Sequence, residues 1–420
     1  MDSTPWWQRL ISACGIVVLL TLAWLLSEQR RKVPWRIVFW GLGLQFAMAV
    51  FVLRTPVGAW LFQALNDGVL KLLDTARQGI VFVFGGYAER EFTIAFNVLP
   101  ILIFFSSLSA LLYHFGILQR FVGAMAWIMR RTMRTSGPET LSAAANVFLG
   151  MTEAPLLIRP YIAAMSRSEL AAVMIGGFAT VAGSVLGAYV GMLREAFPQI
   201  AGHLIAASVM NAPAGLVIAK LLVPPKAEAQ QIGTQATEDS TYVNAVDAAA
   251  QGAGEGIKLA LNVAAMLLAF VALVALIDVL LALPTAAWTQ LTGHPTPAWT
   301  LRRIGAYLLW PLAWLLGIAP ADCGTIATLL SEKVVLNELI AYRHLGQLLE
   351  QGAKLQERSV VIVSYALCGF ANFGSIAIQI GGIGVMAPSR RQELAQLGLR
   401  AMLGGLLATC MSAALAGVLL

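Results

Sequence analysis

The chain has 420 residues, of which 58% are hydrophobic and only 12% are charged. Since soluble domains carry about a quarter charged residues, this composition excludes an ordinary soluble protein and predicts one that is surrounded by a lipid bilayer. The net charge of +6 does not indicate nucleic-acid binding, because the basic residues form short clusters between apolar segments.

The first apolar segment, residues 10–26, is followed by a basic cluster at residues 30–36. No small-residue cleavage site separates the two, so we expect a retained first span and not a removed signal peptide. The basic cluster predicts a cytoplasmic loop and an N-terminus outside. The pair at 130–131 agrees with this orientation under an eight-span count, whereas the pair at 302–303 does not fit so simply, which leaves the orientation open.

About 20 apolar residues cross the hydrocarbon core of a bilayer. By this measure the chain contains about eight candidate spans, near residues 10–27, 35–54, 92–114, 172–194, 201–223, 257–284, 359–387 and 397–419. The segment 57–87 carries charges at helical intervals among apolar residues and predicts an interfacial amphipathic helix.

Two further apolar segments are interrupted by polar residues. The first, 138–161, contains Gly150, Glu153 and Pro155, and the second, 320–342, contains Glu338. Irregular backbone at membrane depth survives only where protein or a wet cavity surrounds it. Each segment therefore predicts a re-entrant helical hairpin. In the second hairpin we expect the adjacent charged residues Glu332 and Lys333 at a solvated turn.

A span with a polar break follows each hairpin, at residues 179–184 and 371–375. The unit of hairpin, broken span and span thus occurs twice, and the single span between the copies inverts the second relative to the first. Inverted repeats place their site near the bilayer midplane, where broken helices meet. We predict an all-α polytopic membrane protein of about eight spans and two hairpins, with the divisions 1–90 (scaffold), 91–223 (first repeat), 224–256 (soluble linker), 257–319 (central span and connector) and 320–420 (second repeat).

The carboxylates Glu153 and Glu338 are the strongest functional candidates, because charges inside a bilayer are expensive and usually functional. They can accept hydrogen bonds from hydroxyl or ring N–H groups of a polar, neutral solute. Hydroxyl and amide side chains nearby can donate and accept, and apolar side chains can cover a ring face; these are Thr152, Asn372 and Ser375, with Val185 and Phe370.

A hard cation would require oxygen ligands where helices unwind. Asn146 and Thr180 supply side-chain oxygens, and the carbonyls of Leu149 and Val181 could complete the shell. Asn and Thr also join packed helices by hydrogen bonds, so a structural role for either residue remains an alternative. The four cysteines and four histidines are scattered without the spacing of a metal site.

Two motifs resemble those of the concentrative nucleoside transporters. Residues 150–156, Gly-Met-Thr-Glu-Ala-Pro-Leu, are similar to the first-hairpin motif Gly-Gln-Thr-Glu-Ala-Pro-Leu of that family. Residues 337–342, Asn-Glu-Leu-Ile-Ala-Tyr, are similar to its second-hairpin motif Asn-Glu-Phe-Val-Ala-Tyr, and the runs 368–372 and 381–384 are also family-like. The resemblance covers the chain from about residue 90 to its C-terminus.

The resemblance implies a homotrimer in a bacterial inner membrane, whose protomers import nucleosides such as uridine or a purine nucleoside; the basic cluster after the first span places the N-terminus in the periplasm. It implies coupling to Na⁺, no other cofactor, no enzymatic activity and an elevator-type alternating-access mechanism. It also assigns residues: Met151, Thr152, Glu153 and Val185 to the nucleobase, Glu338, Phe370, Asn372 and Ser375 to the ribose, and Asn146, Leu149, Thr180 and Val181 to Na⁺.

The chain departs from the family motif at Met151, where the usual Gln would hydrogen-bond the base and Met cannot do so strongly. Base specificity therefore stays open, whereas the hydroxyl of Thr180 favours sodium. The alternatives are a proton-coupled transporter of the same fold, a passive channel, or an intramembrane enzyme that uses the two carboxylates. No nucleophile with a base partner is visible for the enzyme.

Overall fold

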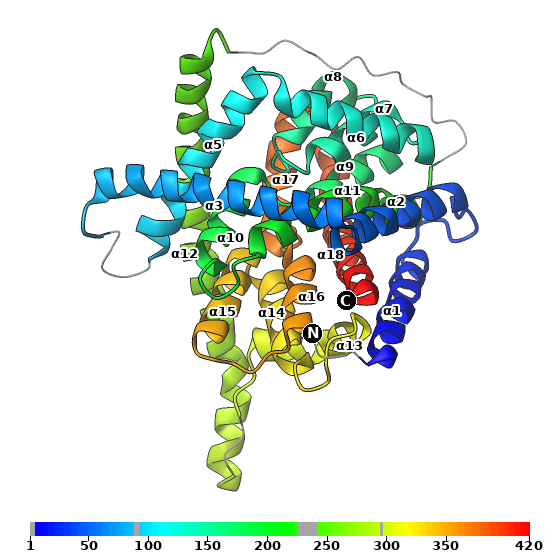
Figure 1. Cartoon of the computed structure of the whole chain (residues 1–420). Helices are drawn as coiled ribbons and strands as arrows, with labels where there is room; N and C mark the ends of the chain where they lie inside the picture. The colour runs from blue at the N-terminus through cyan, green and yellow to red at the C-terminus, as the bar shows by residue number, and fades with distance from the viewer. Residues whose placement is uncertain (1–4, 88–92, 226–241, 295–296) are drawn as a thin grey trace.

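The computed structural model describes residues 5–87, 93–225, 242–294 and 297–420, and every regular element in those residues is a helix. Before the first hairpin the elements are α1 (Trp6–Leu25), α2 (Trp35–Arg54), α3 (Pro56–Phe84), a π-helical turn η1 (Ile94–Val98), α5 (Leu99–His114) and α6 (Ile117–Met133). Figure 1 shows α3 running across α5 and α12.

Short helices occupy the segments predicted as hairpins and as broken spans, and a long helix closes each copy. The first copy comprises α7 (Gly137–Ala145), the 3₁₀ turn η2 (Ala154–Ile158), α8 (Arg159–Ile162), α9 (Arg167–Ala179), α10 (Gly183–Leu193) and α11 (Ile200–Leu222). The second comprises α14 (Cys323–Val335), α15 (Glu338–Glu350), α16 (Glu357–Leu367), α17 (Phe373–Met386), η3 (Pro388–Arg390) and α18 (Arg391–Leu419). The polar breaks in the sequence thus end real helices.

Between the copies lie α12 (Ala245–Thr292) and α13 (Leu301–Leu315). The predicted span 257–284 is too short, because α12 has 48 residues and begins where Asn244 accepts a hydrogen bond from the Asp247 amide. The predicted linker 224–256 is correspondingly shortened from its C-terminal side, and residues 226–241 of it lie outside the described residues. The sequence analysis also predicted no helix at α6, within the first repeat, or at α13, within the connector.

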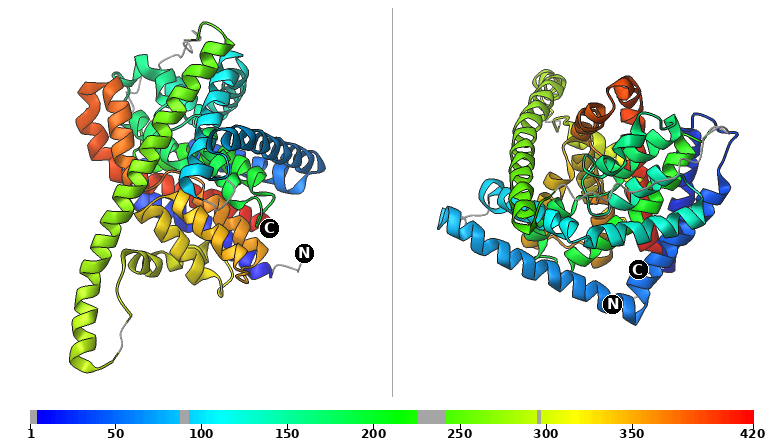
Figure 2. Two further views of the ribbon diagram at one scale, coloured as in Figure 1. Left: turned by 90° about the vertical axis from the view of Figure 1, so that its left-hand side faces the viewer. Right: turned by 90° about the horizontal axis from the view of Figure 1, so that it is seen from above.

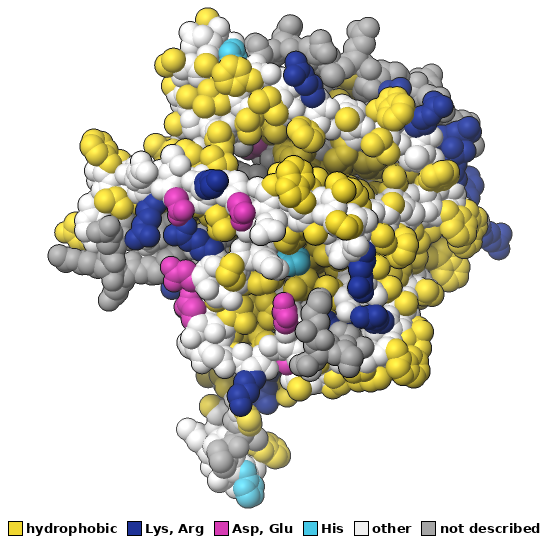
Figure 3. All heavy atoms as spheres, in the orientation of Figure 1, with side chains coloured by type: hydrophobic (Ala, Val, Ile, Leu, Met, Phe, Trp, Pro, Cys, Tyr) yellow, Lys and Arg dark blue, Asp and Glu magenta, His cyan; other side chains and the backbone are white. Residues whose placement is uncertain are grey.

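Seven helical segments of the described residues are long and apolar enough to cross a membrane. They are Trp6–Leu25, Trp35–Arg54, Ile94–His114, Arg167–Leu193, Ile200–Leu222, Ala245–Thr292 and Pro388–Leu419. The predicted span 359–387 is divided between α16 and α17, each of which is too short to be counted. Large apolar side chains such as Leu268 and Trp60 are exposed, and Figure 3 shows many hydrophobic side chains across the face in view, with charged side chains among them, as expected where part of the surface is in contact with lipid.

The helices of the two predicted repeats lie at the centre of the molecule, and α12 lies at its periphery. In the α9–α10 segment 94% of the most apolar window is buried, whereas in α12 the share is only 6%. One end of α12 extends beyond the other helices (Figures 1 and 2). The buried residues of α9, α11 and α18 pack into one core with those of α16, so the broken spans lie inside protein, where irregular backbone is tolerated.

A pair of glycines fixes α12 against α5. A Cβ at Gly252 would lie 2.8 Å from the Cα of Ser107, and one at Gly256 would lie 2.7 Å from the Cα of Ile103. These glycines have the spacing of the small-xxx-small pattern that lets membrane helices approach closely. The hydroxyl of Ser107 donates to the Ala249 carbonyl at 2.9 Å, which is consistent with this close approach.

We expect Gly256→Leu to lower the midpoint of thermal unfolding in detergent by several degrees. The new side chain would clash with the backbone of α5, which cannot move away as a flexible side chain could, and overpacking of this kind costs about 1–3 kcal/mol. Gly254→Leu is the matched control, because a Cβ at Gly254 meets nothing within 4 Å. Equal shifts for the two variants would show that the α5–α12 contact does not depend on these glycines.

Candidate functional site

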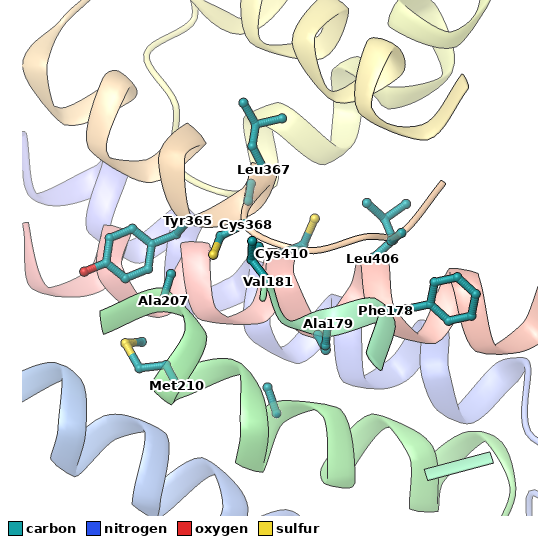
Figure 4. Close-up of a cluster of buried hydrophobic side chains, with 14 of the residues drawn as sticks. Phe178, Ala179, Val181, Ala207, Met210, Tyr365, Leu367, Cys368, Leu406 and Cys410 are labelled. Carbon is teal, nitrogen blue, oxygen red and sulfur yellow. The ribbon is translucent and has the colours of Figure 1, made fainter. Parts of the chain in front are cut away.

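The breaks of the two repeats lie side by side. Asn211, buried in α11, donates to the Ala179 carbonyl at 2.8 Å and to the Cys368 carbonyl at 2.9 Å. Ala179 ends α9 and Cys368 follows α16, so one amide satisfies the carbonyl ends of both broken spans. Figure 4 shows the two unwound segments passing each other beside Cys410, which brings the two predicted repeats together.

The tip of the first hairpin lies against the start of α10. The Gly183 amide donates to the Phe148 carbonyl at 2.8 Å, and Gly150 donates its amide to the Glu153 carboxylate at 3.1 Å. Glu153 is half-buried, and Val185 is buried in the first turn of α10. The structure therefore places the predicted base-side residues on two neighbouring elements.

The same hairpin tip also packs on helices of both repeats. The buried Met151 lies beneath Gly177 of α9, where an added Cβ would be 2.8 Å from the Cβ of Met151. Thr152 lies against Gly382 of α17, whose added Cβ would be 2.6 Å from the Thr152 methyl. Small residues at these two positions let the hairpin tip sit between the repeats.

The tip of the second hairpin holds a buried carboxylate with two donors. The hydroxyl of Tyr189 donates to Glu338 Oε1 at 2.7 Å, and the amide of Asn372 donates to Oε2 at 3.0 Å. The side-chain oxygen of Asn372 caps α17 by accepting from the Ser375 amide at 2.8 Å, and the backbone amide of Asn372 donates to the Phe370 carbonyl. The four predicted ribose-side residues thus form one connected group.

The predicted cation ligands lie at and near the break between α9 and α10. Asn146 is fully buried at the end of α7, and neither atom of its side-chain amide has a hydrogen-bond partner among the described residues. Its nitrogen lies 3.4 Å from the position of a Cβ on Gly176, whose carbonyl accepts from the Thr180 hydroxyl at 2.9 Å. A buried amide oxygen left unmatched by protein is the kind of group that a hard cation would satisfy.

The two remaining candidates lie on the same irregular segments. Leu149 follows Asn146 between α7 and η2, and Val181 lies in the break between α9 and α10. The side chain of Val181 belongs to the buried apolar cluster (Figure 4), so only its backbone is suited to a ligand role. Among the described residues no group of three His, Cys, Asp or Glu could form a transition-metal site.

The expectation of a solvated pair at Glu332 and Lys333 is wrong. Lys333 is completely buried, and its ammonium group donates to the Ala366 carbonyl at 2.7 Å and to the Thr409 hydroxyl at 3.1 Å. Glu332 is buried as well and pairs with Arg302 and His344. Both residues belong to α14, because the helix continues to Val335 and the hairpin turns only at residues 336–337.

Three family profiles match the chain. "Na+ dependent nucleoside transporter C-terminus" matches residues 203–417, the corresponding N-terminus profile matches residues 14–87, and "Nucleoside recognition" (Gate) matches residues 95–196. The chain belongs to the Na⁺-dependent, or concentrative, nucleoside transporter family. The resemblance is therefore confirmed, and it extends through the N-terminal helices beyond the region where the motifs indicated it.

Relatives of this family member occur in animals and bacteria. The mouse sodium/nucleoside cotransporter 1 is 41% identical over all of this chain and 65% of its own length, so the chain spans about two thirds of that relative. An uncharacterized transporter of Haemophilus influenzae is 41% identical, with 97% of each chain covered. Because the family consists of transporters, the prediction that the chain is not an enzyme is also confirmed.

Solved structures of the transporter CNTnw have the same fold as this family member. Its inward-facing, substrate-bound structure has a TM-score of 0.89 at 39% identity and 98% coverage of both chains. An outward-facing variant has a TM-score of 0.90, also at 39% identity. The predicted class, an all-α polytopic membrane protein, is thereby confirmed.

The sequence analysis missed Tyr189 and Asn211 of this nucleoside transporter family member. Each is a buried polar side chain in a largely apolar helix, and each bonds to the other repeat. The available signal for Tyr189 was its position one helical turn after Val185, which places both on one face of α10. Asn211 stands alone among small apolar residues, a pattern that more often joins helices than binds a ligand.

Proposed function

We propose that the chain is a sodium-coupled transporter that imports nucleosides across a membrane. The observation that carries the proposal is the buried Glu338 carboxylate, which two donors orient at the tip of a hairpin where both repeats meet. A buried polar group discriminates strongly between solutes that satisfy it and solutes that do not, because an unmatched group costs about 1–3 kcal/mol.

The two halves of the site suit the two halves of a nucleoside. Glu338, Asn372 and Ser375 supply acceptors and donors for ribose hydroxyls, with Phe370 beside them. On the other side Thr152 and Glu153 would bond to the edge of the base, and Val185 would contact its face. Met151 supplies no strong hydrogen bond, so base selectivity would depend on Thr152, Glu153 and shape.

Sodium is favoured over protons as the coupling ion by the surroundings of Asn146. Its side-chain oxygen is buried and lacks a partner among the described residues, and the Thr180 hydroxyl retains lone pairs after donating to Gly176. With the carbonyls of Leu149 and Val181 these oxygens would form a neutral set, which suits a monovalent hard cation. A bound Na⁺ would be coordinated by these oxygens and would join the first hairpin to the break after α9.

We further propose a homotrimer in a bacterial inner membrane with the N-terminus in the periplasm. The basic loop between α1 and α2 supports this orientation. An elevator movement would carry the hairpins and broken spans past a scaffold that includes parts of residues 1–90 and 257–319. The peripheral position of α12 supports its assignment to that scaffold.

The function is tested by uptake of labelled uridine and adenosine into proteoliposomes. With an inward sodium gradient we expect accumulation above the external concentration, and replacement of sodium by choline at fixed pH should abolish it. Uptake that persists in choline but requires an inward proton gradient would establish the proton-coupled alternative. Equilibration without accumulation under both gradients would indicate a channel.

The cation site has its own prediction. Asn146→Ala should raise the sodium concentration for half-maximal uptake by at least about tenfold, the equivalent of about 1.4 kcal/mol, because a buried oxygen ligand is removed. Asn262→Ala is the control, since Asn262 is an exposed residue of α12. An unchanged sodium dependence in Asn146→Ala would exclude Asn146 from the cation site.

A further inference from the structure

Tyr189 is the only described residue of the first repeat whose side chain bonds directly to the Glu338 carboxylate. Both residues are buried, and the 2.7 Å separation between the hydroxyl and Oε1 is the usual length of a well-formed hydrogen bond between a hydroxyl and a carboxylate. Asn372 occupies Oε2 from the second repeat. The orientation of the carboxylate is therefore set by one donor from each half of the molecule.

The ring of Tyr189 is itself held in place. It packs on the ring of Tyr342 with centroids 4.7 Å apart and an interplanar angle of 31°. The hydroxyl of Tyr342 donates to the Ser364 carbonyl at 2.7 Å, so Tyr342 is anchored to α16. Because both rings are fully buried, the Tyr189 hydroxyl has a fixed position and can determine where Glu338 points.

Tyr189 also connects the two sides of the site through one helix. Val185 and Tyr189 are four residues apart in α10 and share a face. By the proposed function Val185 contacts the base, while Tyr189 reaches the carboxylate that receives the ribose. A displacement of α10 would therefore move the base contact and the orientation of Glu338 together.

We propose that Tyr189 is a positioning residue that determines selectivity for the ribose hydroxyls. An ionised carboxylate has about four acceptor positions. Tyr189 and Asn372 occupy one on each oxygen, and one position on each oxygen remains for a solute donor. A ribose hydroxyl would donate to a remaining acceptor of this carboxylate, so the position in which Tyr189 holds the carboxylate determines how well that hydroxyl is matched. The inference rests on the proposed function.

The test compares Tyr189→Phe with Tyr365→Phe. Each substitution removes one buried hydroxyl, but that of Tyr365 has no hydrogen-bond partner among the described residues. Sodium-driven uptake of uridine and 3′-deoxyuridine is measured in proteoliposomes, and equilibrium binding of both is measured in detergent.

We expect Tyr189→Phe to raise the KM and the Kd for uridine about tenfold, with Vmax within a factor of two. Binding of 3′-deoxyuridine should weaken less, so the preference for uridine should fall by at least threefold, while Tyr365→Phe keeps the original preference. An unchanged preference in Tyr189→Phe, or an equal change in Tyr365→Phe, would overturn the positioning role. Absence of nucleoside uptake and binding by the unaltered protein would instead overturn the proposed function, and this inference with it.

Discussion

Glu338→Gln is expected to reduce nucleoside uptake to background, a loss of at least about 100-fold. Tyr189 and Asn372 both donate to the carboxylate in the native chain. A Gln at this position has one acceptor oxygen and one donor group, so one of these two donors would face an N–H group. Hydrogen bonds to a charged group contribute about 1.5–3 kcal/mol, and an unmatched buried donor costs about 1–3 kcal/mol. Together these effects amount to about 2.5–6 kcal/mol, and a 100-fold change corresponds to about 2.7 kcal/mol.

Loss of uptake must be separated from loss of folding. The control is Glu350→Gln, which makes the same change at the exposed end of the same helix, α15, and should transport normally. Thermal unfolding of both variants in detergent shows whether the protein remains folded. A folded Glu338→Gln protein that retains normal uptake would remove Glu338 from the substrate site and with it the central observation behind the proposed function.

The sequence could predict the breaks but not the contacts between them. Glu338 and Asn372 were identifiable because polar groups in apolar segments are costly and were repeated in each half. Their direct hydrogen bond could not be predicted, because the sequence indicated only that each hairpin is followed by a broken span. Tyr189 lies in an apolar stretch of a helix that is buried on nearly all sides, so no amphipathic pattern marked the direction in which it points.

Errors in the fold have a related cause. Hydropathy predicted that the central span begins at residue 257. The helix begins earlier, because residues 245–256 are mostly alanine, glycine and polar residues, which extend a helix without the hydropathy of a span. The buried Lys333 was misplaced for a similar reason, because a charged pair near a turn usually indicates solvent. Its ammonium group is instead satisfied by oxygens of α16 and α18, which lie 33 and 76 residues further along the chain and could not be identified from local sequence.

Lys220→Met is the substitution expected to destabilise the protein most. Lys220 forms an ion pair with Glu139 of the first hairpin, and both side chains are only 3% exposed. The same ammonium group donates to the Ser168 hydroxyl at 3.0 Å, which in turn donates to the Val223 carbonyl. Glu139 also accepts from the Ser136 amide at the start of α7. The pair therefore joins the base of the first hairpin to the end of α11 and the start of α9.

Removal of one partner from a buried ion pair leaves an uncompensated charge and costs about 3–5 kcal/mol, whereas replacement of both by neutral groups is often tolerated. We therefore expect Lys220→Met to lower the unfolding midpoint in detergent strongly, and Lys220→Met combined with Glu139→Gln to recover much of that loss. If the double variant is as unstable as the single one, the cost lies in packing and not in charge. Recovery would show that the first hairpin is held at its base by electrostatic pairing.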